Sequence, residues 1–140
     1  MSTTGYLDSS AVIALLLDEP GRTGPVNEAL GRCSFVATSM VAYAECRAAL
    51  AAAERGGRVE APAVAVARAR LDDIWFELER VSVTEDRIRH AGALCDQRAL
   101  RGFDALHLAS ALALGNATSF LTWDSRLAQA ARLEGMEVPL

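Results

Sequence analysis

Short apolar runs alternate with longer amphipathic segments along the chain. The short runs are typical of strands that are buried on both faces of a sheet. The longer segments repeat apolar residues at helical spacing, and turn-forming residues separate them. The pattern predicts strands at residues 4–7, 34–37, 78–83, 119–122 and 136–139. It predicts helices at residues 9–17, 23–30, 40–55, 62–73, 85–99, 103–114 and 125–133.

Strands that alternate with helices usually pair in parallel, because each helix returns the chain to the same end of the sheet. The predicted fold is therefore an α/β domain of three layers, in which helices cover both faces of a short parallel sheet of four to five strands. We find no internal repeat and no linker, so residues 1–140 are assigned to a single domain. A hydrophobic content of 51% supplies a core for a domain of that size.

Candidate capping residues precede several of the predicted helices, because a hydroxyl can accept hydrogen bonds from the free N–H groups of the first turn. They are Ser9 or Ser10 for the first helix, Thr38 or Ser39 for the third, and Thr84 for the fifth. At the other end, Gly115 and Asn116 should stop the sixth helix.

The charge balance limits the classes of function. A net charge of −4 argues against a protein that holds nucleic acid by a broad basic surface. It does not exclude a nuclease whose metal ions supply the missing positive charge. All 14 basic residues are arginine, so mechanisms that need an amine nucleophile or a P-loop lysine are excluded.

The three cysteines, Cys33, Cys46 and Cys95, form no CxxC pair. They predict reduced thiols in a cytoplasmic protein, with neither a disulfide framework nor a zinc site. The N-terminus has no signal-peptide pattern, and the longest apolar run, residues 11–17, is too short to cross a bilayer. We therefore expect no membrane association.

Two aspartates follow predicted strands directly. Asp8 ends the first strand and Asp124 follows the fourth, and both enter a turn that leads to a helix. In open α/β sheets, ligands bind outside the carboxyl ends of the strands, so the two aspartates can share a site if their strands are neighbours. The alternative is that each simply caps the following helix, since aspartate is a favoured cap.

Two further acids stand among apolar helix residues. Glu45 lies inside the third predicted helix and Asp104 near the start of the sixth. Isolated buried carboxylates are costly, and they usually neutralise, pair or bind a metal. Asp104 could alternatively stabilise a helix N-terminus, whereas Glu45 in mid-helix has no such role and could only be exposed or paired with an arginine such as Arg47. Asp96 is expected on a solvated helix surface.

Four segments also resemble the conserved motifs of one protein family, the PIN domains, and more narrowly the VapC-type toxins of bacterial toxin–antitoxin pairs. The segments are residues 6–16 (YLDSSAVIALL), 39–45 (SMVAYAE), 104–111 (DALHLASA) and 121–127 (LTWDSRL). The end of the chain, residues 135–138, resembles the family's final strand. The order and spacing of these segments agree with the family over essentially the whole chain, and no carboxylate is missing.

The resemblance implies a PIN-like α/β/α fold and an endoribonuclease that is the toxic component of a type II toxin–antitoxin system. It implies that Mg²⁺ or Mn²⁺ is held by four carboxylates: Asp8, Glu45, Asp104 and Asp124. It also implies that Ser10 and Thr122 are hydrogen-bond partners of the side chains that form this site. The implied partners are RNA, a second copy of the chain, and a VapB-type antitoxin whose C-terminal segment fills the groove.

The chemistry of the acids agrees with a metal site. Carboxylates that share one site repel each other, and a cation removes the conflict. Mg²⁺ prefers oxygen ligands and often bridges to phosphate. We expect Asp8 and Asp104 to bind the metal directly, with Asp124 and Glu45 completing the site directly or through water. One or two ions are equally compatible with the sequence.

Because the net charge is −4, individual side chains near the site must provide the contacts with RNA. Arg126 and Arg101 are candidates for phosphate contacts, with a solvated helix surface as the alternative for each. Trp123 could stack on a base, but core packing is the favoured interpretation. His107 lies one turn from Asp104 and is interpreted as a packing residue, since magnesium prefers oxygen. His90 is expected on the surface.

Two other classes of function compete with a nuclease. Receiver domains and haloacid-dehalogenase-like phosphatases also place an aspartate after the first strand beside Mg²⁺, but both normally use a lysine near the phosphate, and this chain has none. A solitary PIN nuclease or a binding module without catalysis would keep the fold. The complete set of four acids argues against the binding module.

Overall fold

The computed structural model describes residues 3–115 and 117–140. Within them, four parallel strands form one sheet in the order β3-β2-β1-β4: β1 (Thr4–Leu7), β2 (Phe35–Ser39), β3 (Glu79–Val81) and β4 (Thr118–Leu121). The helices of these residues are α1 (Ser9–Leu17), α2 (Thr23–Leu30), α3 (Ala42–Arg55), α4 (Ala61–Trp75), α5 (Glu85–Arg98), α6 (Gly102–Leu112) and α7 (Ser125–Leu133). None of them is long and apolar enough to span a bilayer.

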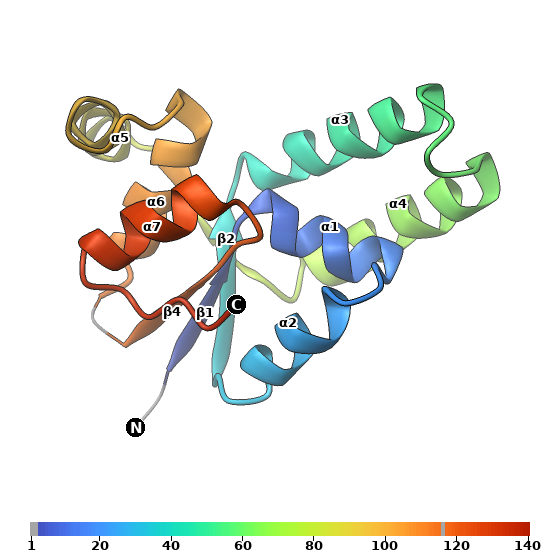
Figure 1. Ribbon diagram of the computed structural model, residues 1–140, viewed down its shortest axis with the longest axis horizontal. Helices are drawn as coiled ribbons and strands as arrows, with labels where there is room; N and C mark the ends of the chain where they lie inside the picture. Colours follow the sequence, from blue (N-terminus) through green and yellow to red (C-terminus); the bar gives the residue numbers. More distant parts are fainter. Residues whose placement is uncertain (1–2, 116) are drawn as a thin grey trace.

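Helices cover both faces of the sheet, as predicted (Figure 1). Successive side chains of a strand point to opposite faces, so Tyr6 and Leu7 belong to different cores. Tyr6 stacks on Phe120 at 5.5 Å between ring centres and packs with α5, α6 and α7. Leu7 and Leu121 are buried on the other face, with α1, α2, α3 and α4. The arrangement confirms the three-layer α/β/α fold.

The order of the strands determines where a ligand site can form. From β1 the chain moves through β2 to β3 at one edge, and it then returns to place β4 on the other side of β1. The helices that follow the adjacent strands β1 and β4, namely α1 and α7, therefore pack on opposite faces of the sheet (Figure 1). Ligands in open α/β sheets bind at such a switch point.

The start of α3 differs from the prediction. Thr38 and Ser39 lie in β2, because they pair with Arg80 and Val81 of β3, so neither caps the helix. The helix begins at Ala42 instead of residue 40, and no side chain caps it. Pairing with a strand about forty residues away overrides the local preference of these residues for a helix start.

The predicted fifth strand, at residues 136–139, is wrong. The described residues contain only a single parallel bridge there, between Ser119 and Glu137. The Phe120 N–H donates to the Glu137 carbonyl at 2.8 Å. Pro139 has no N–H to continue a ladder, which explains why the pairing goes no further.

The remaining helix ends follow the prediction with small shifts. Thr84 caps α5 by accepting from the Arg87 N–H at 3.2 Å, as expected. Asp8, and neither Ser9 nor Ser10, caps α1. Gly115 has a φ of 98°, in the left-handed region that favours glycine, and ends the segment after α6. Asn116, predicted to end that helix with it, lies outside the described residues.

Candidate active site

All four predicted carboxylates lie at helix N-termini. Asp8 and Asp124 are the capping residues of α1 and α7. Glu45 and Asp104 lie in the first turns of α3 and α6. The positive end of each helix dipole favours a nearby anion, so the backbone stabilises the ionised form of these acids independently of any side-chain contact.

Asp8 and Asp124 each cap a helix through a side-chain hydrogen bond. Oδ1 of Asp8 accepts from the Ala11 N–H at 3.0 Å, and Oδ1 of Asp124 accepts from the Leu127 N–H at 2.9 Å. Each cap uses one carboxylate oxygen and leaves Oδ2 for other partners. The capping alternative and the site hypothesis are therefore compatible, because the cap fixes the direction of the second oxygen.

Asp8 is held beneath the surface by two hydroxyl groups. It is 4% exposed, and it accepts from Ser10 Oγ at 2.7 Å and from Thr122 Oγ1 at 2.5 Å. Burial raises the pKa of Asp8, although the hydrogen bonds from Thr122, Ser10 and Ala11 oppose the shift. Since Ser10 Oγ also accepts from the Trp123 N–H at 2.9 Å, this network joins the turn after β1 to the turn after β4.

The prediction for Glu45 was wrong in one respect. Because α3 begins at Ala42, Glu45 lies in the first turn and not in mid-helix. Its partner is His107 and not Arg47: Oε1 lies 2.6 Å from His107 Nε2 and accepts from Ser9 Oγ at 2.7 Å. Burial alone would raise the pKa of Glu45, but the hydrogen bonds from His107 and Ser9 outweigh burial and lower it.

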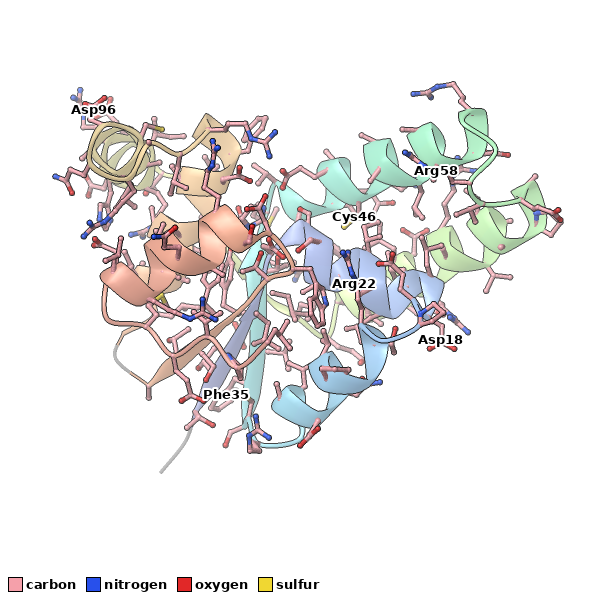
Figure 2. All side chains as sticks on the ribbon, in the orientation of Figure 1. Asp18, Arg22, Phe35, Cys46, Arg58 and Asp96 are labelled. Carbon is pink, nitrogen blue, oxygen red and sulfur yellow. The ribbon has the colours of Figure 1, made fainter. Side chains whose placement is uncertain are left out.

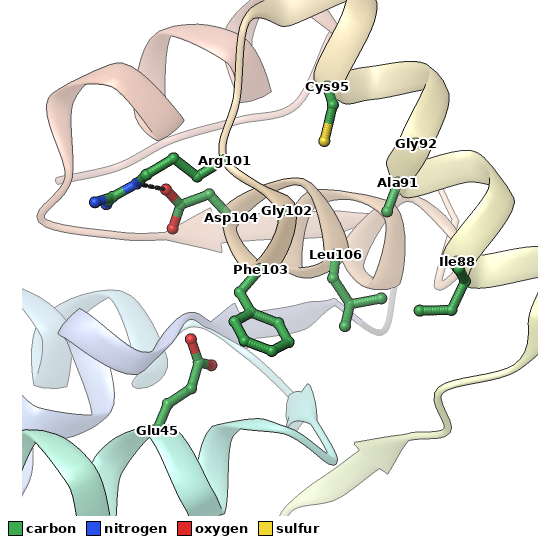
Figure 3. A pocket seen from close by; sticks show the side chains of 10 residues that line it. All are labelled: Glu45, Ile88, Ala91, Gly92, Cys95, Arg101, Gly102, Phe103, Asp104 and Leu106. Atoms are coloured by element: carbon green, nitrogen blue, oxygen red, sulfur yellow. Dashed lines mark hydrogen bonds and ion pairs between the residues drawn. The ribbon is translucent and has the colours of Figure 1, made fainter.

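Asp104 and Asp124 converge on one cation. Arg101 Nε donates to Asp104 Oδ2 at 3.1 Å (Figure 3). Arg101 Nη2 also lies 3.9 Å from Asp124 Oδ2. The Arg101 side chain is 80% exposed, so these contacts are weak and readily exchanged. The two carboxylates are thus close enough to share a positive charge.

Two pockets meet at Asp104. The larger, of about 780 Å³, has apolar walls that include Ile88 and Leu106, and it is lined at one end by Glu45, Asp104 and Arg101 (Figure 3). The smaller, of about 490 Å³, is lined by residues that include Asp104, Asp124, Trp123 and Arg126. Asp104 and Arg101 line both, so the two pockets form a continuous depression. Asp8 lines neither pocket.

Several other predictions can be compared directly with the structure. Arg126 is exposed and lines the smaller pocket. Trp123 is half-buried against the core, and the Arg22 guanidinium lies over its ring at 5.5 Å from the centre, so core packing is confirmed. His90 and Asp96 are exposed as expected, and Asp96 points outward from α5 (Figure 2).

The sequence did not indicate the partners of His107. It is buried as predicted, but it is hydrogen-bonded on both ring nitrogens, and one of these contacts reaches Glu45. The only sequence signal was a polar residue on an apolar helix face, one turn after Asp104.

The residues fit a hard divalent cation held by few protein ligands. In the described part of the chain, no three His, Cys, Asp or Glu side chains lie close enough together to form a ready-made metal cluster. Mg²⁺ does not need one, because it usually binds one or two carboxylates and keeps several waters. The acids at the depression offer oxygen only. Cys95 lines the larger pocket with its apolar residues (Figure 3). Cys46 lies between α3 and α1 (Figure 2), and burial raises its pKa to about 12.

Comparison with known proteins identifies the family. The family model described as PIN domain matches residues 5–133. The chain belongs to the PIN-domain family. Within it, this PIN protein belongs with the VapC proteins: it is 39% identical over 134 residues to Ribonuclease VapC49 and to Ribonuclease VapC45, from two strains of Mycobacterium tuberculosis. Each match covers 95% of this chain and 92% of the relative.

Solved structures share the fold at low sequence identity. A toxin–antitoxin complex from Klebsiella pneumoniae aligns with a TM-score of 0.68 at 18% identity, covering 97% of this PIN protein and 98% of that chain. VapBC2 from Rickettsia felis, bound to a DNA fragment from its promoter, aligns with a TM-score of 0.65 at 15% identity, covering 96% of both chains. These matches agree with the predicted PIN fold.

We expect Asp8→Asn to raise the free energy of unfolding in metal-free buffer near pH 7 by about 1 kcal/mol. Burial raises the folded-state pKa of Asp8 above 3.8, so the ionised form opposes folding. In the wild type, ionisation of Asp8 lowers the free energy of unfolding. This loss is absent below the unfolded-state pKa and grows as the pH rises through the folded-state pKa. Denaturant unfolding between about pH 4 and pH 8 measures it.

Asp96→Asn, on an exposed helix surface, is the matched control and should change little at any pH. If Asp8→Asn lowers stability at every pH, the ionised Asp8 is a net stabiliser and our interpretation of its burial is wrong.

Proposed function

We propose that this VapC-family protein is a Mg²⁺-dependent endoribonuclease and the toxic component of a type II toxin–antitoxin system, with Mn²⁺ as a substitute metal. The observation that carries the proposal is that all four acids lie at helix N-termini, two of them on the helices that follow the adjacent strands β1 and β4. The ribonuclease names of relatives that are 39% identical support the substrate class.

Asp8 and Asp104 are proposed to hold the ion, and Asp124 and Glu45 to complete the site directly or through water. Bound there, the ion supplies positive charge that orients the phosphodiester and activates water for attack. The protein itself orients the carboxylates. Hydrogen bonds from Ser10 and Thr122 hold Asp8. Backbone N–H groups at the starts of α1 and α7 hold Asp8 and Asp124. Where they act through water, Asp124 or Glu45 would help to deprotonate it.

Two arginines are proposed to contact RNA phosphates. Arg126 lines the smaller pocket with Asp124, and Arg101 lies between Asp104 and Asp124. Because Arg101 is mostly exposed, it can exchange its carboxylate partners for a phosphate once a metal neutralises them. Local contacts of this kind suit a chain whose net charge is −4.

The larger pocket supports an antitoxin partner. Its apolar wall includes Ile88 and Phe103, which are 50% and 61% exposed, and its acidic end is formed by Glu45 and Asp104. An antitoxin segment with apolar residues and a basic residue would match both parts. The homodimer stays a proposal that follows from membership of the family, as does a cytoplasmic location.

We expect the purified protein, freed of any antitoxin, to cut total cellular RNA only when Mg²⁺ or Mn²⁺ is added. Asp8→Asn and Asp104→Asn should each lower the cleavage rate by more than roughly 100-fold, since even the outer partners of metal ligands contribute 10–100-fold. Gel and end-sequencing assays measure the products, and Asp96→Asn is the control. Cutting that survives chelation, or both substitutions, excludes the proposed chemistry.

We expect Arg126→Gln to raise KM for RNA by roughly threefold to fivefold with little change in kcat, because one exposed ion pair contributes at most about 1 kcal/mol. Arg132→Gln, an exposed position on the same helix, is the matched control and should have no such effect. Equal effects of the two substitutions would show that net charge matters and that Arg126 has no specific contact.

We expect expression of the protein alone to arrest growth, and co-expression of the product of an adjacent small gene to relieve the arrest. Asp104→Asn should remove the toxicity while the protein stays folded and still binds that partner. A genome without such a neighbouring gene, together with RNA cleavage in vitro, would favour a solitary PIN nuclease. Toxicity that Asp104→Asn retains would exclude cleavage as its cause.

A further inference from the structure

His107 joins the core of the protein to the candidate active site. The ring is 2% exposed and lies on α6, one turn after Asp104. Its Nδ1 lies 2.8 Å from the Tyr6 hydroxyl and its Nε2 lies 2.6 Å from Glu45 Oε1. Both nitrogens of a fully buried imidazole are therefore used.

The partners determine which nitrogen carries the proton. An ionised carboxylate can only accept, so the short contact to Glu45 requires a hydrogen on Nε2. The Tyr6 hydroxyl, 2.8 Å from Nδ1, carries a proton and can donate it to that nitrogen. A ring that carries its hydrogen on Nε2 and accepts on Nδ1 satisfies both contacts.

The contacts of Glu45 leave one of its oxygens available. Oε1 accepts from His107 Nε2 and from Ser9 Oγ, which lies 2.7 Å away. No donor in the described residues reaches Oε2, and the Glu45 side chain lines the larger pocket beside Asp104 (Figure 3). A glutamate in a helix first turn has several rotamers, so holding Oε1 also fixes the direction of Oε2.

We propose that His107 is a positioning residue: it holds Glu45 so that Oε2 points into the active site, and Tyr6, by donating to Nδ1, supports the ring tautomer that makes this hydrogen bond. The inference rests on the proposed nuclease function. It differs from simple packing, in which the ring would only fill space beside Tyr6 and its loss would lower stability alone.

Two substitutions separate these roles. His107→Leu keeps apolar volume but removes the donor, whereas His107→Gln restores an N–H near the position of Nε2. We expect His107→Leu to lower kcat and the affinity for Mn²⁺, measured by calorimetry without RNA, by roughly 10–100-fold. His107→Gln should recover most of both quantities. His90→Gln, on the exposed face of α5, is the control and should change neither.

The tautomer gives a readout that does not depend on activity. In a two-bond ¹H–¹⁵N spectrum of the wild type, His107 should be protonated on Nε2 only, and Tyr6→Phe should shift the Nδ1 resonance because it removes the donor to that nitrogen. Tyr6→Phe removes a single hydroxyl, so it also provides the kinetic comparison if His107→Leu fails to fold; we expect a loss of kcat smaller than that of His107→Leu.

Three results would overturn the proposal: protonation of wild-type His107 on Nδ1, kcat and Mn²⁺ affinity in folded His107→Leu within twofold of the wild type, or equal losses in the Leu and Gln variants. If the wild type cuts no RNA, the proposed function fails instead, and the nitrogen spectrum still decides the hydrogen-bond assignment.

Discussion

The parallel pairing of β1 with β4 is the constraint on which the rest of the molecule depends. Leu7 pairs with Leu121, so both strands end at the same level, and the Asp8 N–H donates to the Leu121 carbonyl at 3.2 Å. The two turns that follow lie side by side, while their helices leave on opposite faces of the sheet. A polar site forms there because the first N–H groups of a helix have no partner within the helix, and Asp8 and Asp124 accept from them.

The four acids of the candidate site differ in burial and in the groups that stabilise them. Asp8 is buried and depends on neutral donors, whereas Asp104 and Asp124 are partly exposed and share Arg101. Glu45 lies between these extremes, with one oxygen held by His107 and Ser9. The half of the site formed by Asp8 and Glu45 is therefore fixed to the core, and the half near Arg101 is free to rearrange around an ion or a phosphate.

The sequence predicted much of this because the informative features were local. Asp8 directly follows one apolar strand and Asp124 lies three residues after another, and parallel topology alone places such residues at one edge. The predictions from sequence failed where contacts between residues far apart in the chain determine the local structure. Pairing of Thr38 and Ser39 with β3 delays the start of α3, which moves Glu45 into the first turn. The contact between His107 and Glu45 spans 62 positions, and no local pattern encodes it.

The double duty of Asp8 and Asp124 constrains how this chain can lose activity during evolution. Each residue begins a helix as well as belonging to the proposed site, and a helix start tolerates asparagine or serine far better than alanine. An inactive descendant that still folds should therefore carry an amide or a hydroxyl at these two positions. Replacement of one carboxylate oxygen by an amide nitrogen would remove the charge that a metal site needs and would keep the acceptor that caps the helix.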